Sequence, residues 1–170
     1  MNKASFVKLT SILCIVLLTQ ACSKKSDESA HQNTSLSSSA LELHYRILTL
    51  DSHADTPLRL IEPGFDLAER HDPHETGSKL DYPRMIEGGL DAVFLAAFVA
   101  QGIRDDDGHT RARELALQML EAVWASAEKN SDIVGIALNP GDAAVLEAEG
   151  KRAIYLSIEN GYPIGNDLKN

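Results

Sequence analysis

Short apolar runs alternate with longer stretches of helical periodicity from residue 46 onward. Residues 47–50, 90–99, 132–138 and 152–158 are the apolar runs, and the second is apolar almost throughout. A short continuous run of this kind suits a strand that is buried on both faces, as in a parallel sheet. The pattern therefore predicts four strands.

Residues 81–87, 110–129 and 141–148 predict the helices between these strands. In the longest of them, apolar residues recur at a spacing of three and four, which is typical of a helix with one buried face. Trp124 falls on that face and is predicted to lie in the core. Acidic residues 105–107 precede this helix, where they suit the positive end of its dipole.

Regular alternation of strands and helices predicts an α/β fold, either a barrel or an open doubly wound sheet. Polar residues at two strand ends favour the barrel. Asp51, His53 and Asp55 follow the first apolar run, and Glu159 follows the fourth. In a barrel such positions converge on one face. Because no glycine-rich phosphate loop follows a strand, a nucleotide-binding fold is disfavoured.

His53 and Asp55 carry the candidate chemistry. Residues two apart in an extended chain point to the same side, so the imidazole of His53 and the carboxylate of Asp55 would lie together. Pro57 then ends the regular hydrogen bonding of the strand. These ligand types suit zinc or a similar first-row ion. The pattern His-x-Asp is weak by itself. Residues 71–74 also contain two histidines, but Pro73 and the lack of a flanking strand predict a solvated loop there.

Residues 1–22 have the parts of a secretion signal: two lysines, an apolar stretch over residues 9–18, and Thr-Gln-Ala-Cys. The apolar stretch is too short to span a bilayer, which indicates a removed signal. Ala21 before Cys22 resembles a bacterial lipoprotein cleavage site, so Cys22 is the candidate lipidation residue. Ordinary secretion is the alternative. Ser23 favours, by resemblance, a periplasm-facing position on the outer membrane.

Residues 23–45 are polar and predict a disordered tether between the membrane and a domain over residues 46–170. Cys14 would be lost with the leader and Cys22 acylated, so neither a disulfide nor a cysteine metal site is expected. The formal net charge is -9, which argues against nucleic acid as a partner. The composition therefore agrees with one acidic domain, and the leader predicts that lipid tethers this domain to the bacterial cell envelope.

Three blocks of sequence together resemble the membrane dipeptidase family, also called renal dipeptidases, of zinc metallopeptidases. They are Leu-Asp-Ser-His-Ala-Asp-Thr at 50–56, Leu-Asp-Tyr-Pro-Arg-Met-Ile-Glu-Gly-Gly-Leu-Asp-Ala-Val-Phe at 80–94, and Ser-Ile-Glu-Asn-Gly at 157–161. They occur in the family's order. The resemblance implies a (β/α)8 TIM-type barrel that holds two zinc ions and hydrolyses dipeptides.

By position, the resemblance implies that His53 and Asp55 hold one zinc and that Glu159 bridges both. Two such cations lower the pKa of a shared water and polarise the substrate carbonyl, so that hydroxide attacks the peptide carbon. A dipeptide substrate is implied, whereas it stays open from the sequence whether a complete enzyme forms the family's homodimer. Tyr162 stands where some relatives carry a histidine, which leaves the substrate preference open.

Residues 46–170 are about half of the roughly 250 residues of a complete barrel, or its first four βα units. In the family, the other ligands of the second zinc and the remaining catalytic residues come from later strands. The chain is therefore expected to be an N-terminal fragment that is inactive by itself, with no catalytic residue beyond its metal ligands. Unpaired edges on the first and fourth strands predict poor solubility.

Two other functions remain open from the sequence. One is a different binuclear metal hydrolase barrel that acts on amides, lactones or phosphoesters. Many such barrels use His-x-His on the first strand and a bridging lysine, in contrast to His53, Asp55 and Glu159. The other is a non-catalytic lipoprotein that binds a ligand or is a remnant of an enzyme.

Overall fold

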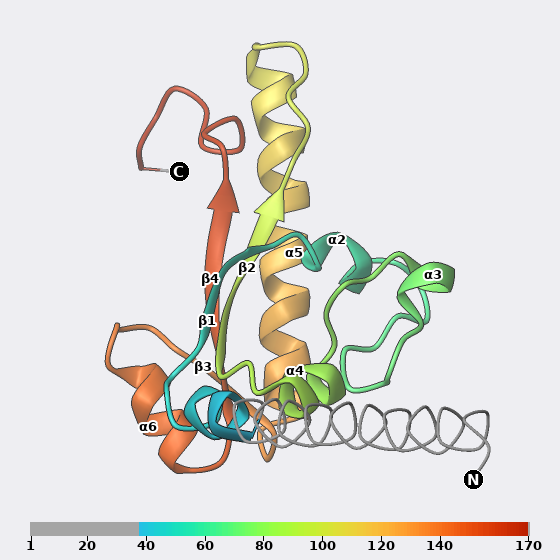
Figure 1. Ribbon diagram of the computed structural model, residues 1–170. Coiled ribbons are helices and arrows are strands. Elements are labelled where there is room, and N and C mark those ends of the chain that lie inside the picture. The colour runs from blue at the N-terminus through green and yellow to red at the C-terminus, as the bar shows by residue number, and fades with distance from the viewer. Residues whose placement is uncertain (1–37, 170) are drawn as a thin grey trace, which may run out of the picture. The chain divides into compact units, whose positions relative to one another are not determined.

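The computed structural model describes residues 38–169 (Figure 1). The predicted signal over residues 1–22, with Cys22, lies outside the described residues, as does most of the predicted tether. The chain divides into two compact units, Met1–Arg46 and Ile47–Asn170. Among the described residues, no helix has the length and apolar character needed to cross a membrane.

In the first unit, residues 38–44 form a helix, whereas the disordered tether was predicted to extend to residue 45. The physical reason is local: Ala40, Leu41 and Glu42 are strong helix formers. The interpretation of residues 38–44 as disordered is therefore wrong.

The described part of the second unit alternates strands and helices, as predicted. Its strands are β1 (Leu50–Ala54), β2 (Ala92–Phe98), β3 (Val134–Ile136) and β4 (Arg152–Glu159). Its helices are α2 (Pro57–Leu60), α3 (Pro73–Thr76), α4 (Tyr82–Gly88), α5 (Asp106–Lys129) and α6 (Asp142–Ala148).

All strand pairs are parallel, which confirms the expected α/β class, and the strand order is β1-β2-β4-β3. The order differs from four successive barrel strands, because β4 lies directly beside β2 and β3 lies at the edge. β2 pairs with β4 over its full length, whereas β3 contributes only three residues. Alternation along a sequence predicts connectivity, but it does not predict which strands become neighbours.

Open edges are predicted on the first and fourth strands. Within the described residues the first is confirmed, whereas β3 is the edge strand at the other end and leaves only part of β4 unpaired. β1 forms one edge of the sheet. β3 pairs only with Arg152, Ala153 and Ile154, so β4 has no strand partner on that side from Tyr155 onward. Unpaired backbone groups along a strand can recruit other chains, so the solubility prediction stands as a prediction.

Helices α4 and α5 cover one face of the sheet, and α5 runs alongside the strands (Figure 1). The core on this helix-covered face includes Val93 and Leu95 of β2. Helix α6 packs on the opposite face, near the start of β4. Farther along that face, Phe94 and Tyr155 stack with their ring centroids 4.6 Å apart.

Trp124 is 47% exposed, so its predicted place in the core is wrong. Val123, the preceding residue of α5, is fully buried. Successive residues of an α-helix are turned by about 100°, so a helix that directs Val123 into the core turns Trp124 toward its margin.

The helix starts follow their acidic residues. Asp81 precedes α4 and accepts a hydrogen bond from the backbone N–H of Arg84. Asp105 likewise accepts from the N–H of Gly108, which places the start of α5 at Asp106 rather than at residue 110. Asp105 therefore caps the helix, and Asp106 and Asp107 lie in its first turn, so these acidic residues serve the helix start as predicted.

Candidate metal centre

An irregularity in β1 decides which side chains face the site. Asp51 pairs with Val93 and Ala54 with Leu95, so two residues of β1 lie opposite one residue of β2. This is the arrangement of a β-bulge. Val93 and Leu95 both belong to the helix-side core, and paired residues point to the same face of a sheet. His53, the neighbour of Ala54, therefore points to the opposite face.

Strict alternation along the strand would place Asp51 on the same side as His53 and Asp55, but the bulge turns it to the other side. The Oδ1 atom of Asp51 accepts a hydrogen bond from the backbone N–H of His53 at 3.0 Å. Asp51 thus stabilises the irregular backbone. It is not among the donors that converge at the site.

Glu159 reaches the same face from β4. It is the last residue of that strand and pairs with Phe98 at the end of β2. Ala97, the neighbour of Phe98, is buried in the helix-side core, so Phe98 and Glu159 point to the other face. Parallel strands bring their carboxyl ends to one edge, and His53 and Glu159 meet there although 106 positions separate them.

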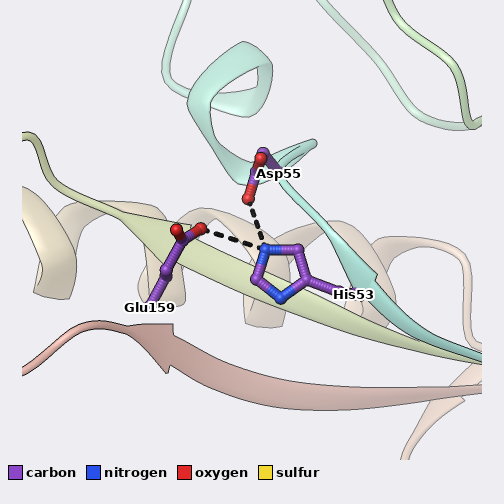
Figure 2. A group of neighbouring side chains, drawn as sticks. All are labelled: His53, Asp55 and Glu159. Carbon is purple, nitrogen blue, oxygen red and sulfur yellow. Dashed lines mark hydrogen bonds and ion pairs between the residues drawn. The ribbon is translucent and has the colours of Figure 1, made fainter.

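Two carboxylates converge on one nitrogen of His53. Nε2 lies 3.0 Å from Oδ1 of Asp55 and 3.0 Å from Oε2 of Glu159, and Figure 2 shows both contacts ending at the same ring atom. One ring N–H can point fully at only one acceptor. The side chains of His53, Asp55 and Glu159 are 49%, 51% and 38% exposed, so the site is open to solvent.

The donor set fits a divalent first-row metal ion. One imidazole nitrogen and two carboxylate oxygens lie within 4.8 Å of one another. Ligands of a tetrahedral zinc, about 2.0–2.2 Å from the ion, are about 3.3–3.6 Å apart. The 3.0 Å contacts need to open only slightly to admit such an ion. His53, Asp55 and Glu159 are thus the residues that could hold a metal.

The carboxylates also set the charge of the imidazole. Desolvation lowers the pKa of His53, whereas its hydrogen bonds to Asp55 and Glu159 and the negative charge of both groups raise it more. The net effect is a pKa above the ordinary value of 6.5. A proton and a metal ion therefore compete for the same electron-rich position.

A cavity of about 720 Å³ lies beside β1. His53 and Asp55 line it, and Arg59 and Lys79 bring positive charge to its wall. Arg59 also forms an ion pair with Glu62 at 2.9 Å. The cavity provides room for a small molecule next to the two donors from β1.

The structure does not bring the histidines of residues 71–74 to the site. His71 stacks on Phe65, with centroids 4.3 Å apart, and its Nε2 lies 2.7 Å from the carbonyl oxygen of Asp66. His74 belongs to α3, a short helix within the predicted loop. The interpretation that these histidines are not part of a ligand cluster is therefore consistent with the structure.

Sequence reasoning missed Asn160, which follows Glu159 and has a φ of 62°. The dipeptide Asn160-Gly161 is a turn signal that could have indicated it. Tyr162 is buried rather than open to the cavity beside β1.

Residues 37–170 match the sequence model of the membrane dipeptidase family, peptidase family M19. A search of curated proteins finds no match. Solved structures do match, and this chain spans 33–40% of the length of three of them.

The probable dipeptidase PvdM from Pseudomonas aeruginosa is 30% identical with a TM-score of 0.67, over 78% of this chain and 33% of its own. The metallo peptidase dipeptidase AC, of family M19, is 23% identical with a TM-score of 0.57, over 70% and 37%. A metallo peptidase from Rhodobacter sphaeroides, liganded with a phosphinate mimic of the dipeptide L-Ala-D-Ala, is 22% identical with a TM-score of 0.52, over 70% and 40%.

These similarities confirm the predicted fold class, an α/β chain that forms part of a TIM-type barrel. The match to the family model extends from residue 37 to residue 170, which is more than half of the chain. The chain therefore belongs to the membrane dipeptidase family, peptidase family M19.

Proposed function

We propose that this chain is the N-terminal part of a zinc-dependent dipeptidase and that His53, Asp55 and Glu159 hold a zinc ion. The observation that carries the proposal is the convergence of their three donor atoms within 4.8 Å at one edge of a parallel sheet. Family membership supports a hydrolase that cleaves dipeptides.

The three side chains would have distinct parts. A zinc ion bound there would lower the pKa of a coordinated water and polarise a peptide carbonyl. Nε2 of His53 can donate its lone pair to a metal ion only when that nitrogen carries no proton. Asp55 and Glu159 would balance positive charge. A carboxylate has two oxygens, so Glu159 could also serve as a ligand to a second ion, whereas Nε2 of His53 has a single lone pair.

The described residues contain one group of three such donors. A second zinc ion would therefore need ligands from outside residues 38–169. We infer that this chain has negligible dipeptidase activity by itself, and the 33–40% share of the matched structures that it spans supports this inference.

The location of the protein is also a proposal. The leader pattern supports a lipid on Cys22 and a periplasm-facing place on the outer membrane of a bacterial cell. The mass of the mature protein would test this. A mass equal to residues 22–170 plus acyl chains is expected, and an unmodified Cys22 would contradict it. Whether a complete enzyme forms a homodimer stays open.

Metal content tests the proposed site. The purified chain is incubated with zinc and dialysed, and its metal is measured by mass spectrometry. We expect about one zinc in the wild type and loss of most of it in Glu159→Gln and His53→Ala. His74→Ala is the control, because it removes an exposed histidine outside the site. Equal zinc in all variants would contradict the ligand assignment, and none in the wild type would favour a non-catalytic remnant.

Activity is measured with the same samples. We expect no turnover of a panel of dipeptides by the zinc-loaded chain, because residues 38–169 contain a single group of three metal donors. Hydrolysis that depends on Glu159 would refute the inactivity of this chain while supporting its assignment as a dipeptidase.

A further inference from the structure

Asn160 is in the left-handed region, with a φ of 62°, and no other non-glycine residue that the structure describes has a positive φ. Asparagine tolerates this conformation better than most residues, but it is uncommon outside glycine. Asn160 directly follows Glu159, the last residue of β4. The chain thus turns sharply at the candidate ligand.

The side chain of Asn160 links two segments at this turn. Its Nδ2 donates to the carbonyl oxygen of Val99 at 3.2 Å, and its Oδ1 accepts from the backbone N–H of Tyr162 at 2.9 Å. The ladder between β2 and β4 ends with the pair Phe98 and Glu159. Asn160 therefore adds one further link between the strands just beyond the candidate ligand.

Tyr162 anchors the far side of the turn. It is only 8% exposed, and its hydroxyl donates to the carbonyl oxygen of Ile103 at 2.8 Å. Its own carbonyl oxygen accepts from Nδ1 of the buried His109, at 2.9 Å. A side chain at Gly108 would come within 2.6 Å of the tyrosine hydroxyl, so a glycine in the first turn of α5 leaves room for this hydroxyl. The turn is thus fixed to a rigid element.

Packing covers the Glu159 side chain only in part. It is 38% exposed, and that of its partner His53 is 49% exposed. The position of such a half-buried carboxylate therefore depends also on the backbone that carries it. The backbone after Glu159 is held by the two hydrogen bonds of Asn160 and, through Tyr162, by α5.

We propose that Asn160 is a positioning residue for the candidate metal centre: its side-chain amide ties the end of β4 to Val99 and Tyr162, and thereby keeps the Glu159 carboxylate beside Nε2 of His53. The proposal rests on the function proposed above for His53 and Glu159. Asn160 does not touch the metal or the substrate in this account and acts only through Glu159.

Asn160→Gly tests the proposal, because glycine adopts a positive φ without strain while both side-chain hydrogen bonds disappear. We expect the affinity of the 170-residue chain for zinc, measured by calorimetry, to fall about 10-fold, as is typical when a residue that supports a ligand is lost. An unchanged affinity would overturn the proposal.

Asn130→Gly is the matched control. Nδ2 of Asn130 donates to the carbonyl oxygen of Ser126 at 2.8 Å, at the far end of α5. The control also replaces an asparagine by glycine and removes a side-chain hydrogen bond to the backbone. We expect it to lower the melting temperature and to leave zinc affinity unchanged within about twofold. An equal loss of affinity in the control would show that Asn160 affects zinc binding only through the stability of the fold, and would overturn its positioning role.

A second measurement needs no metal. In the metal-free chain, a nuclear Overhauser effect between the His53 ring and the Glu159 side chain reports their proximity. We expect it in the wild type and in Asn130→Gly, and we expect it to weaken or vanish in Asn160→Gly. Its loss in Asn160→Gly supports positioning even if the wild type binds no zinc, in which case the proposed function alone fails. Its persistence in Asn160→Gly overturns the positioning role.

Discussion

Some carboxylates of this chain are buried and hydrogen-bonded within the fold, whereas others are at least partly open to solvent. Asp55 and Glu159 are 51% and 38% exposed, and each contacts the imidazole of the candidate metal centre. The side chain of Asp81 is fully buried and accepts hydrogen bonds from the N–H of His71 and from the N–H and Nε of Arg84. Burial with several donors makes Asp81 a structural group, whereas exposure leaves the other two able to accept a cation.

Asp81 predicts a pH dependence of stability. Burial acts to raise the pKa of Asp81, but the hydrogen bonds from His71 and Arg84 and the charge of Arg84 outweigh it and hold the pKa below 3.8. The ionised group therefore stabilises the fold above about pH 4, and this stabilisation is lost as the pH falls through the lowered pKa. We expect Asp81→Asn to cost about 3 kcal/mol at pH 7 and much less near pH 2.

Denaturant unfolding of both proteins at the two pH values measures this difference. Asp132→Asn is a useful control, because Asp132 is an exposed carboxylate whose replacement is expected to cost little at either pH. A cost for Asp81→Asn that does not change with pH would contradict the assignment of the effect to the ionised carboxylate.

Helix α5 shows how an element divides its residues between core and surface. Its buried positions recur at helical spacing and include Met119, which has no exposed surface. Leu117, two residues earlier, is 50% exposed. Both lie within the same 24-residue helix. Replacing either residue by alanine changes helix propensity only slightly, because methionine, leucine and alanine are all good helix formers.

We expect Met119→Ala to lower the free energy of unfolding by about 2–5 kcal/mol, because it leaves a cavity under the sheet. Leu117→Ala removes a half-exposed side chain and is expected to cost less than about 1 kcal/mol. Chemical denaturation of the two variants makes the comparison. Equal costs would show that α5 does not face the sheet as described.

The sequence predicts some helices and strands more accurately than others. Helix α4 was predicted nearly to the residue, because Asp81 and Gly89 act locally: Asp81 caps the start, and Gly89 ends the helix with a φ of 64°. The strand β3 was predicted, but its place at the edge of the sheet was not, since strand order depends on contacts between distant segments. The first strand was predicted from residue 47, but Ile47 is 51% exposed and β1 begins at Leu50.

The candidate site was predicted through residue types and a family resemblance, which together indicated His53, Asp55 and Glu159. The bulge that turns Asp51 away from them arises from pairing with β2 and leaves no local signal. One of the two hydrogen bonds of the Asn160 side chain is to Val99, 61 positions away. Sequence patterns identify such donors, but tertiary pairing decides which of them meet.

At the scale of the second unit, an apolar groove of about 500 Å³ lies on the sheet face opposite α5. Its lining includes Phe94 and Tyr155 from the sheet and Leu138 from the loop before α6, which is 73% exposed. Open apolar surface next to unpaired strand edges favours association between chains.

We predict that the chain associates in a concentration-dependent way and that Leu138→Lys weakens this association. Ile103→Lys is the matched control, because Ile103 is 74% exposed, lies outside the groove and receives the same change of charge. Sedimentation velocity over a range of concentrations measures the effect. A monomer at all concentrations, or an equal effect of both variants, would contradict a role for the groove.

One imidazole and two carboxylates are proposed to hold a single cation. Anomalous diffraction from crystals of the zinc-loaded protein, collected at the zinc absorption edge, would locate that cation. We expect one strong peak about 2.0–2.2 Å from Nε2 of His53 and from carboxylate oxygens of Asp55 and Glu159. A peak held by other residues, or no peak at this edge of the sheet, would contradict this proposal.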